Sequence, residues 1–143
     1  MKKMYLLLII TSIVFFGCAS AVRLSMAEGE GVYSFTEPNP VSKIEAYNSA
    51  RVWLAQNAGD YQKVVKLEDD KTGTLVLKPS MKVKVAGVWK WMYYTITIEV
   101  EEAQIIFNFV VNEMLEGHYP PVDQMDYIKN YFIVIKNDIM KQL

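Results

Sequence analysis

Apolar and polar side chains alternate over most of residues 74–111, which is the clearest pattern in the chain. An alternation with a period of two predicts strands that bury one face. We expect strands with short connections, which favour an antiparallel meander, at residues 74–78, 81–85, 93–101 and 104–111. Shorter strands are predicted at residues 33–36 and 61–67, and the polar run 68–73 predicts a hairpin turn before residue 74.

Two other segments carry apolar residues at intervals of three and four, the spacing of one helix face. The first helix is predicted over residues 43–58. It begins at the capping box Ser42-Lys43-Ile44-Glu45, and Gly59 suits its C-terminal cap. Its predicted core face comprises Ile44, Tyr47, Leu54 and Ala58, with Ala50 and Trp53 on the flank.

The second helix is predicted to begin after Asp123, whose carboxylate can cap the first turn, and to run to about Lys141. A sheet of about five antiparallel strands with two helices on one face buries every apolar stripe of the chain. The sequence therefore predicts a two-layer α+β domain over residues 32–143, in the order strand, helix, about four strands, helix. The core stripe of the second helix is Met125, Ile128, Phe132, Ile135 and Ile139.

The N-terminal residues have a different character. Two lysines precede an apolar run, and the run ends at Phe15-Phe16-Gly17-Cys18, which resembles the bacterial lipobox. We expect residues 1–17 to be a signal peptide, Cys18 to be lipidated, and residues 18–31 to form a flexible tether. An uncleaved transmembrane anchor over residues 4–22 and a plain cleaved signal are the alternatives. All three predict export, and lipidation predicts an anchor in the outer membrane that faces the periplasm.

Charge and composition limit the partners. The chain has 15 basic and 16 acidic residues, so removal of Lys2 and Lys3 with the signal leaves 13 against 16, a formal charge of −3. A nucleic-acid binder would show a basic face, so we expect no nucleic-acid partner. One histidine and one cysteine cannot supply a zinc site, and no P-loop or dinucleotide fingerprint is present, so we expect no metal and no cofactor.

Few residues offer catalytic chemistry. Glu99, Glu101 and Glu102 form an acidic group, and paired carboxylates can do acid–base work, but a polar sheet face near a turn is the preferred interpretation. The acids at 68–70 are contiguous, which favours a solvated turn over a calcium loop. His118 is interpreted as a loop residue, because no nucleophile motif accompanies it. We therefore expect no enzyme activity.

Aromatic residues cluster before the longest predicted strand. On an extended chain Trp89, Trp91 and Tyr93 point to one side, opposite the core residue Tyr94. Exposed, they would form a binding surface for protein, glycan or lipid. The alternative is that the first strand, the tether or a loop covers them. The candidate binding surface, on the sheet face opposite the helices, comprises Trp89, Trp91, Tyr93, Thr95 and Thr97.

Three segments carry a family resemblance: residues 50–55, with the sequence Ala-Arg-Val-Trp-Leu-Ala, residues 64–73, and the Thr/Ile strand 94–100. Together they resemble a bacterial envelope family of unknown function whose fold is like that of the TATA-box-binding protein (TBP). The resemblance covers roughly residues 35–143 and implies a TBP-like domain. It implies no activity, and DNA binding does not follow from the fold.

The leading hypothesis is a non-enzymatic binding module of the cell envelope. Its lipid anchor would hold it at the membrane, and an envelope protein or a glycan would be its partner. The first alternative is a structural subunit of an envelope assembly, bound through an exposed edge strand. A hydrolase that uses the acidic residues is the weaker alternative.

Overall fold

The computed structural model describes residues 31–114 and 119–143. The predicted signal peptide, Cys18 and most of the tether therefore lie outside the described residues, and so does His118. Within the described ranges, neither of the two longer helices combines the length and apolar character needed to cross a bilayer.

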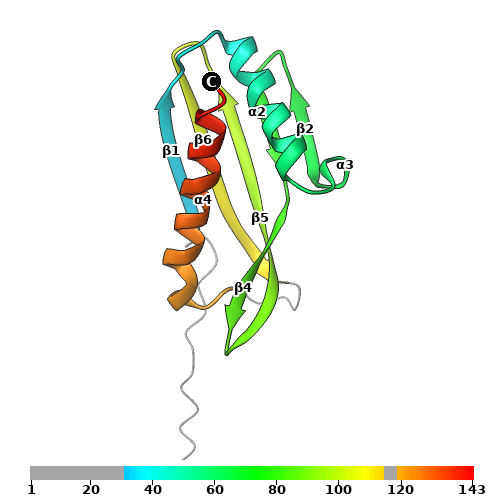
Figure 1. Cartoon of the computed structure of the whole chain (residues 1–143), viewed down its shortest axis with the longest axis vertical. Coiled ribbons are helices and arrows are strands. Elements are labelled where there is room, and N and C mark those ends of the chain that lie inside the picture. Colours follow the sequence, from blue (N-terminus) through cyan, green and yellow to red (C-terminus); the bar gives the residue numbers. More distant parts are fainter. Residues whose placement is uncertain (1–30, 115–118) are drawn as a thin grey trace, which may run out of the picture.

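The longest strand, β5 (Val88–Val100), organises the sheet (Figure 1). Along one side it pairs with β6 (Gln104–Met114), and along the other side with β4 (Ser80–Val85) and then β3 (Thr74–Leu77). Outer strands extend the sheet on both sides: β1 (Val32–Pro38) pairs with β6, and β2 (Val65–Asp69) pairs with β3. The described residues thus form six strands, all paired antiparallel, against the five or so expected.

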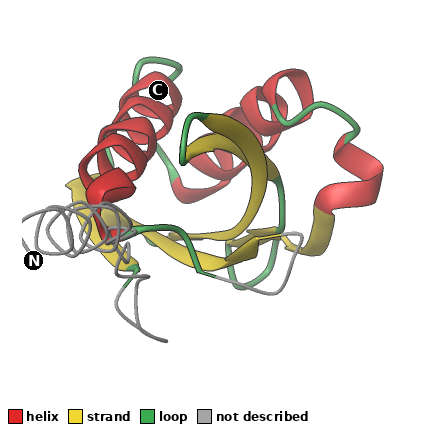
Figure 2. Cartoon of the chain, turned by 90° about the horizontal axis from the view of Figure 1, so that it is seen from below, coloured by secondary structure: helices red, strands yellow, loops and turns green. Residues whose placement is uncertain are grey.

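Two helices cover one face of this sheet, as predicted (Figure 2). Helix α2 (Lys43–Asn57) begins as expected, because Ser42 Oγ accepts a hydrogen bond from the Glu45 amide at 3.4 Å. Gly59 follows it with a φ of +70°, the left-handed conformation that suits the end of a helix. Helix α4 (Met125–Met140) follows the 3-10 turn η2 (Val122–Gln124). The chain is therefore a two-layer α+β domain.

The core lies between the helices and the inner face of the sheet. Phe132 of α4 stacks on Phe109 of β6, with ring centroids 4.6 Å apart and planes 13° from parallel. It also meets the ring of Tyr94 on β5 at 5.1 Å. The largest fully buried side chains are those of Phe107, Phe109, Phe132, Leu54, Leu75, Leu77, Met92, Ile98, Ile105, Ile128, Ile139 and Val83. Apart from Leu75, Leu77 and Met92, these are residues that alternation or helical spacing had assigned to the core.

Four details of the prediction were wrong. Residues 61–64 form a short helix, α3 (Tyr61–Val64), because the amides of Lys63 and Val64 bond to the carbonyl oxygen of Asp60. Ile44 is 68% exposed, since at 100° per residue it lies about 100° from the centre of the stripe that α2 buries. That stripe comprises Ala46, Tyr47, Ala50 and Leu54.

The third and fourth corrections concern helix and strand ends. Gln124, not Asp123, is the N-cap of α4, and the Gln124 side chain makes no capping hydrogen bond. Strand β5 begins at Val88, five residues before the predicted start, because β4 and β5 form a hairpin. The turn residues Ala86 and Gly87 both have positive φ, at 49° and 85°, as a two-residue type I′ turn requires.

The β4–β5 hairpin projects beyond the rest of the sheet (Figure 1). Pairing between β5 and β6 stops at Met92 and Met114, so residues 88–91 pair with β4 alone among the described strands. The hairpin also twists and curls toward the side of the sheet that carries the helices (Figure 2). These features place its aromatic residues at one end of the domain.

Candidate functional site

The predicted binding surface divides into a sheet part and a hairpin part. Thr95 and Thr97 lie on the outer face of the sheet, alternating with buried residues of β5, and both are partly exposed. Asn112 Nδ2 donates a hydrogen bond of 3.0 Å to Thr95 Oγ1, which fixes this hydroxyl on the sheet surface. Tyr93 lies next along the same face, at the base of the hairpin.

The two tryptophans of the hairpin are exposed. Trp89 is 58% and Trp91 46% accessible to solvent. Val88, next to the turn, is 60% exposed. Exposed tryptophans are uncommon on a protein surface, so a cluster of apolar residues here indicates a contact surface.

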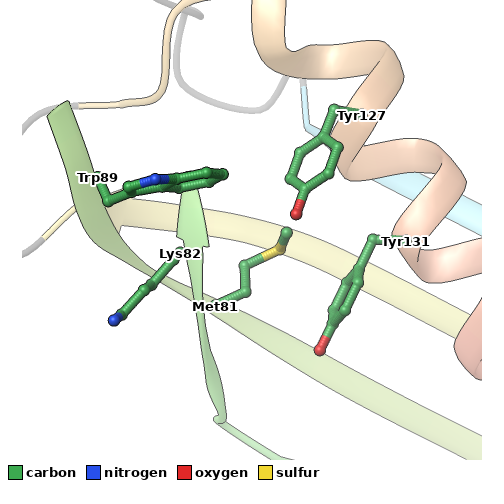
Figure 3. A pocket seen from close by; sticks show the side chains of 5 residues that line it. All are labelled: Met81, Lys82, Trp89, Tyr127 and Tyr131. Carbon is green, nitrogen blue, oxygen red and sulfur yellow. The ribbon is translucent and has the colours of Figure 1, made fainter. Parts of the chain in front are cut away.

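Trp89 departs from the predicted arrangement. It borders a cleft of about 390 Å³ together with two tyrosines of α4, Tyr127 and Tyr131, so it does not belong simply to the face opposite the helices (Figure 3). Met81 and Lys82 of β4 complete the lining. The reason is the twist of the hairpin, which brings the start of β5 close to the first turns of α4. Three aromatic rings and one ammonium group therefore meet in one open cleft.

Tyr131 is held in place from behind by the buried Tyr94. The two rings are perpendicular, with centroids 6.1 Å apart. Burial raises the pKa of Tyr94 far above its ordinary value, and the neighbouring phenol of Tyr131 raises it further. Tyr94 is thus a buried, neutral phenol whose ring packs against one wall of the cleft.

Positive charge accompanies the aromatic residues. Lys82 Nζ lies 5.0 Å from the centre of the Trp91 ring, a cation–π arrangement. Lys82 is opposite Trp91 in the hairpin, and Lys84 is opposite Trp89. Each ammonium group therefore has an indole on the neighbouring strand.

The acidic residues do not form part of this cleft. Asp69 Oδ1 accepts hydrogen bonds from the amides of Lys71 and Thr72, at 3.0 and 3.3 Å. The side chain of Thr72 lowers the pKa of Asp69 most, and the two amide bonds lower it further. The run at 68–70 thus ends β2 and enters the turn before β3. Glu101 Oε2 accepts from Gln104 Nε2 at 2.8 Å across the β5–β6 turn. In the described residues no three His, Cys, Asp or Glu side chains are grouped as metal ligands.

Sequence reasoning missed four contributors to the cleft: Met81, Lys82, Tyr127 and Tyr131. The tyrosines are four residues apart on α4, beside its core stripe, and this spacing places them on one helix face. That signal was available in the sequence. What it could not show was which part of the sheet the face would meet, since this depends on the curl of the hairpin.

Comparisons with known proteins identify the domain. The family described as "Domain of unknown function (DUF4468) with TBP-like fold" matches residues 36–110. A TBP-like protein from Parabacteroides distasonis ATCC 8503 has a similar structure, with a TM-score of 0.57 and 13% sequence identity over 82% of this chain and 94% of that one. A DUF4468 family protein from Bacteroides ovatus ATCC 8483 aligns with a TM-score of 0.44 and 17% identity, over 59% of this chain and 56% of that one. No curated protein matches the chain.

Proposed function

The chain belongs to the DUF4468 family of unknown function with a TBP-like fold, and from this premise we propose that it is an exported, lipid-anchored, non-enzymatic binding module of the cell envelope. Its binding surface is the aromatic end of the domain, formed by Trp89 and Trp91 with the outer sheet residues Tyr93, Thr95 and Thr97. The observation that carries this proposal is the exposure of both tryptophans on a projecting hairpin.

Two features support binding rather than chemistry at this surface. The cleft is lined by aromatic rings, a thioether and one lysine, groups that recognise a ligand but offer no nucleophile paired with a base. The outer sheet face presents hydroxyl, amide and aliphatic groups on a pleated surface, which suits contact with a protein or a glycan. DNA binding is not proposed, since the chain has a net charge of −1.

The anchor is tested first. Cells that express the full chain take up an alkyne-labelled fatty acid, and we expect label on the wild-type protein and none on the Cys18→Ala variant. Fractionation should place the labelled protein in the envelope. An unlabelled wild-type protein in the soluble fraction would refute lipid anchoring.

The binding surface is tested by crosslinking in intact envelopes, with the full chain as bait. We expect a captured protein or glycan that is lost from the Trp89→Ala/Trp91→Ala variant. The matched control is Val52→Ala/Val134→Ala, which removes two exposed apolar side chains from the helices and should keep the partner. Equal thermal unfolding of both variants excludes loss of fold as the cause.

A partner that both variants retain would favour the alternative of a structural subunit. The described sheet ends in β1 and β2, whose outer edges pair with no other described strand. In that case Leu67→Lys, on β2, should release the partner, because Leu67 is 46% exposed at this edge. The Trp89→Ala/Trp91→Ala variant should keep the partner.

A further inference from the structure

The β4–β5 hairpin differs from the rest of the chain in charge. Residues 71–98 contain five lysines and no acidic residue, whereas the whole chain has a net charge of −1. Three of these lysines, Lys82, Lys84 and Lys90, are on the hairpin itself. Lys82 and Lys84 are exposed, and no carboxylate of the described residues forms an ion pair with either. The hairpin is therefore a positively charged projection on a slightly acidic protein.

The tip of the hairpin is apolar as well as basic. Val88, Trp89 and Trp91 are its exposed apolar side chains, and each tryptophan has a lysine opposite it on β4. Tryptophan and lysine together are typical of segments that settle at a membrane interface. The indole is accommodated among the headgroups, and the lysine stem lies in the apolar layer while its ammonium group meets phosphate.

The chain enters the domain from the same end. Strands β1 and β5 run in the same direction, because both are antiparallel to β6, and Val32 and Thr95 both lie opposite Val110. From Thr95 the hairpin extends eight residues to Gly87, a distance of about 26 Å at roughly 3.3 Å per residue. Residues 19–31, which join Cys18 to Val32, can span at most about 45 Å. A lipid on Cys18 would therefore hold the hairpin tip within reach of the bilayer.

We propose that the β4–β5 hairpin docks on the anionic headgroup surface of the bilayer that holds the lipid anchor. This inference rests on the proposed function and names lipid as the component that the hairpin binds. Val88 and the two indoles enter the headgroup layer, and Lys82 and Lys84 pair with phosphate groups. The outer sheet face at Thr95 and Thr97 stays free for a protein or glycan partner, and docking holds this face in position, so loss of both tryptophans releases that partner as well.

Tryptophan fluorescence tests this docking directly. The chain has three tryptophans, so Trp53→Phe leaves only Trp89 and Trp91 as indole emitters. The lipidated full-length variant is reconstituted into vesicles of phosphatidylethanolamine and phosphatidylglycerol with brominated acyl chains. We expect strong quenching relative to vesicles without bromine, and a blue shift relative to the protein without vesicles. Lys82→Gln/Lys84→Gln, or about 1 M salt, where the screening length is about 3 Å, should remove most of the quenching.

The matched control carries Trp89→Phe and Trp91→Phe, so that Trp53 on α2 is the sole indole. Its emission should not be quenched, because α2 lies at the other end of the domain from the hairpin (Figure 1). Circular dichroism of each variant verifies the fold. Quenching of Trp53 equal to that of the hairpin indoles would mean that the domain lies on the membrane without a preferred orientation, which overturns the proposal.

Flotation of the vesicles separates the two proposals. Protein that floats with the vesicles but shows no quenching of Trp89 and Trp91 keeps its anchor and refutes docking. Protein that does not float refutes the anchor. Docking is then tested by mixing this protein with the vesicles, and quenching of Trp89 and Trp91 would support it. Loss of quenching when phosphatidylglycerol is replaced by phosphatidylcholine is expected, since the lysines require anionic headgroups.

Discussion

At the scale of single residues, Gly73 has the least freedom to change. Its φ is +81°, and a Cβ atom there would overlap the carbonyl oxygen of Val100. The carbonyl oxygen of Gly73 in turn accepts a hydrogen bond of 2.9 Å from the Val100 amide, which ties the turn before β3 to the end of β5. We expect Gly73→Ala to lower the free energy of unfolding by at least about 2 kcal/mol, measured by urea denaturation.

Gly59 provides the control for this substitution. Its φ is also positive, at +70°, but nothing lies within 4 Å of the position that a Cβ atom would take. Gly59→Ala should therefore cost only the backbone strain, about 1 kcal/mol. Equal losses at the two positions would contradict the role of the Val100 contact.

Ala86 is the opposite case, because a substitution at this position should increase the stability of the fold. It is the described non-glycine residue with a positive φ, 49°, at the first position of the hairpin turn. Asparagine tolerates this conformation, and Asn-Gly is the preferred pair for a type I′ turn. Ala86→Asn should raise the free energy of unfolding by about 1 kcal/mol, detected as a higher thermal midpoint. An unchanged or lower midpoint would show that the tip is not strained.

At the scale of elements, the strands and helices that bury one regular face were predictable. Apolar and polar residues alternate in strands β5 and β6, and α4 repeats its apolar residues at helical spacing. The residues on the buried face of each element could therefore be predicted from their spacing. The segment 61–64 was misjudged because its apolar residues fit a strand, whereas the bonds to the Asp60 carbonyl oxygen favour a helical turn. The start of β5 was missed because no turn was recognised at Ala86-Gly87.

The packing of α4 on the sheet depends most on one aromatic ring. Phe132 is fully buried and contacts the rings of Tyr33, Tyr94, Phe109 and Tyr131. Phe132→Ala should reduce the free energy of unfolding by about 3–5 kcal/mol, a large part of the stability of a domain of this size. Val134→Ala, on the exposed face of the same helix, should change it by less than about 0.5 kcal/mol. Chemical denaturation of both variants measures the difference.

At the scale of the whole molecule, the candidate site could be predicted only in part. Alternation placed Thr95 and Thr97 on the outer face, and both lie there. The cleft could not be predicted, because it forms where the hairpin curls against α4 and joins Trp89 to Tyr127 and Tyr131. Its parts are about 40 residues apart in sequence. Long-range contact of this kind depends on the twist of the sheet, which no local pattern specifies.

Stability of the whole domain should fall at alkaline pH because of its buried tyrosines. Burial raises the pKa of Tyr94 above its ordinary value of 10.0, and burial with the hydrogen bond to Glu68 raises the pKa of Tyr61. Above about pH 10 the unfolded chain loses tyrosine protons that the folded chain retains, so the unfolded state binds fewer protons and the free energy of unfolding decreases.

The size of this decrease follows from the number of such tyrosines. A tyrosine that stays protonated only in the folded state lowers the free energy of unfolding by about 1.4 kcal/mol per pH unit above pH 10. Tyr94→Phe removes one of them, so its thermal midpoint should fall less steeply than that of the wild type between about pH 9 and 11. Lysine ionisation is common to both proteins and cancels in the comparison. Parallel curves would mean that the phenol of Tyr94 ionises as readily in the folded as in the unfolded chain, so that burial does not keep it neutral.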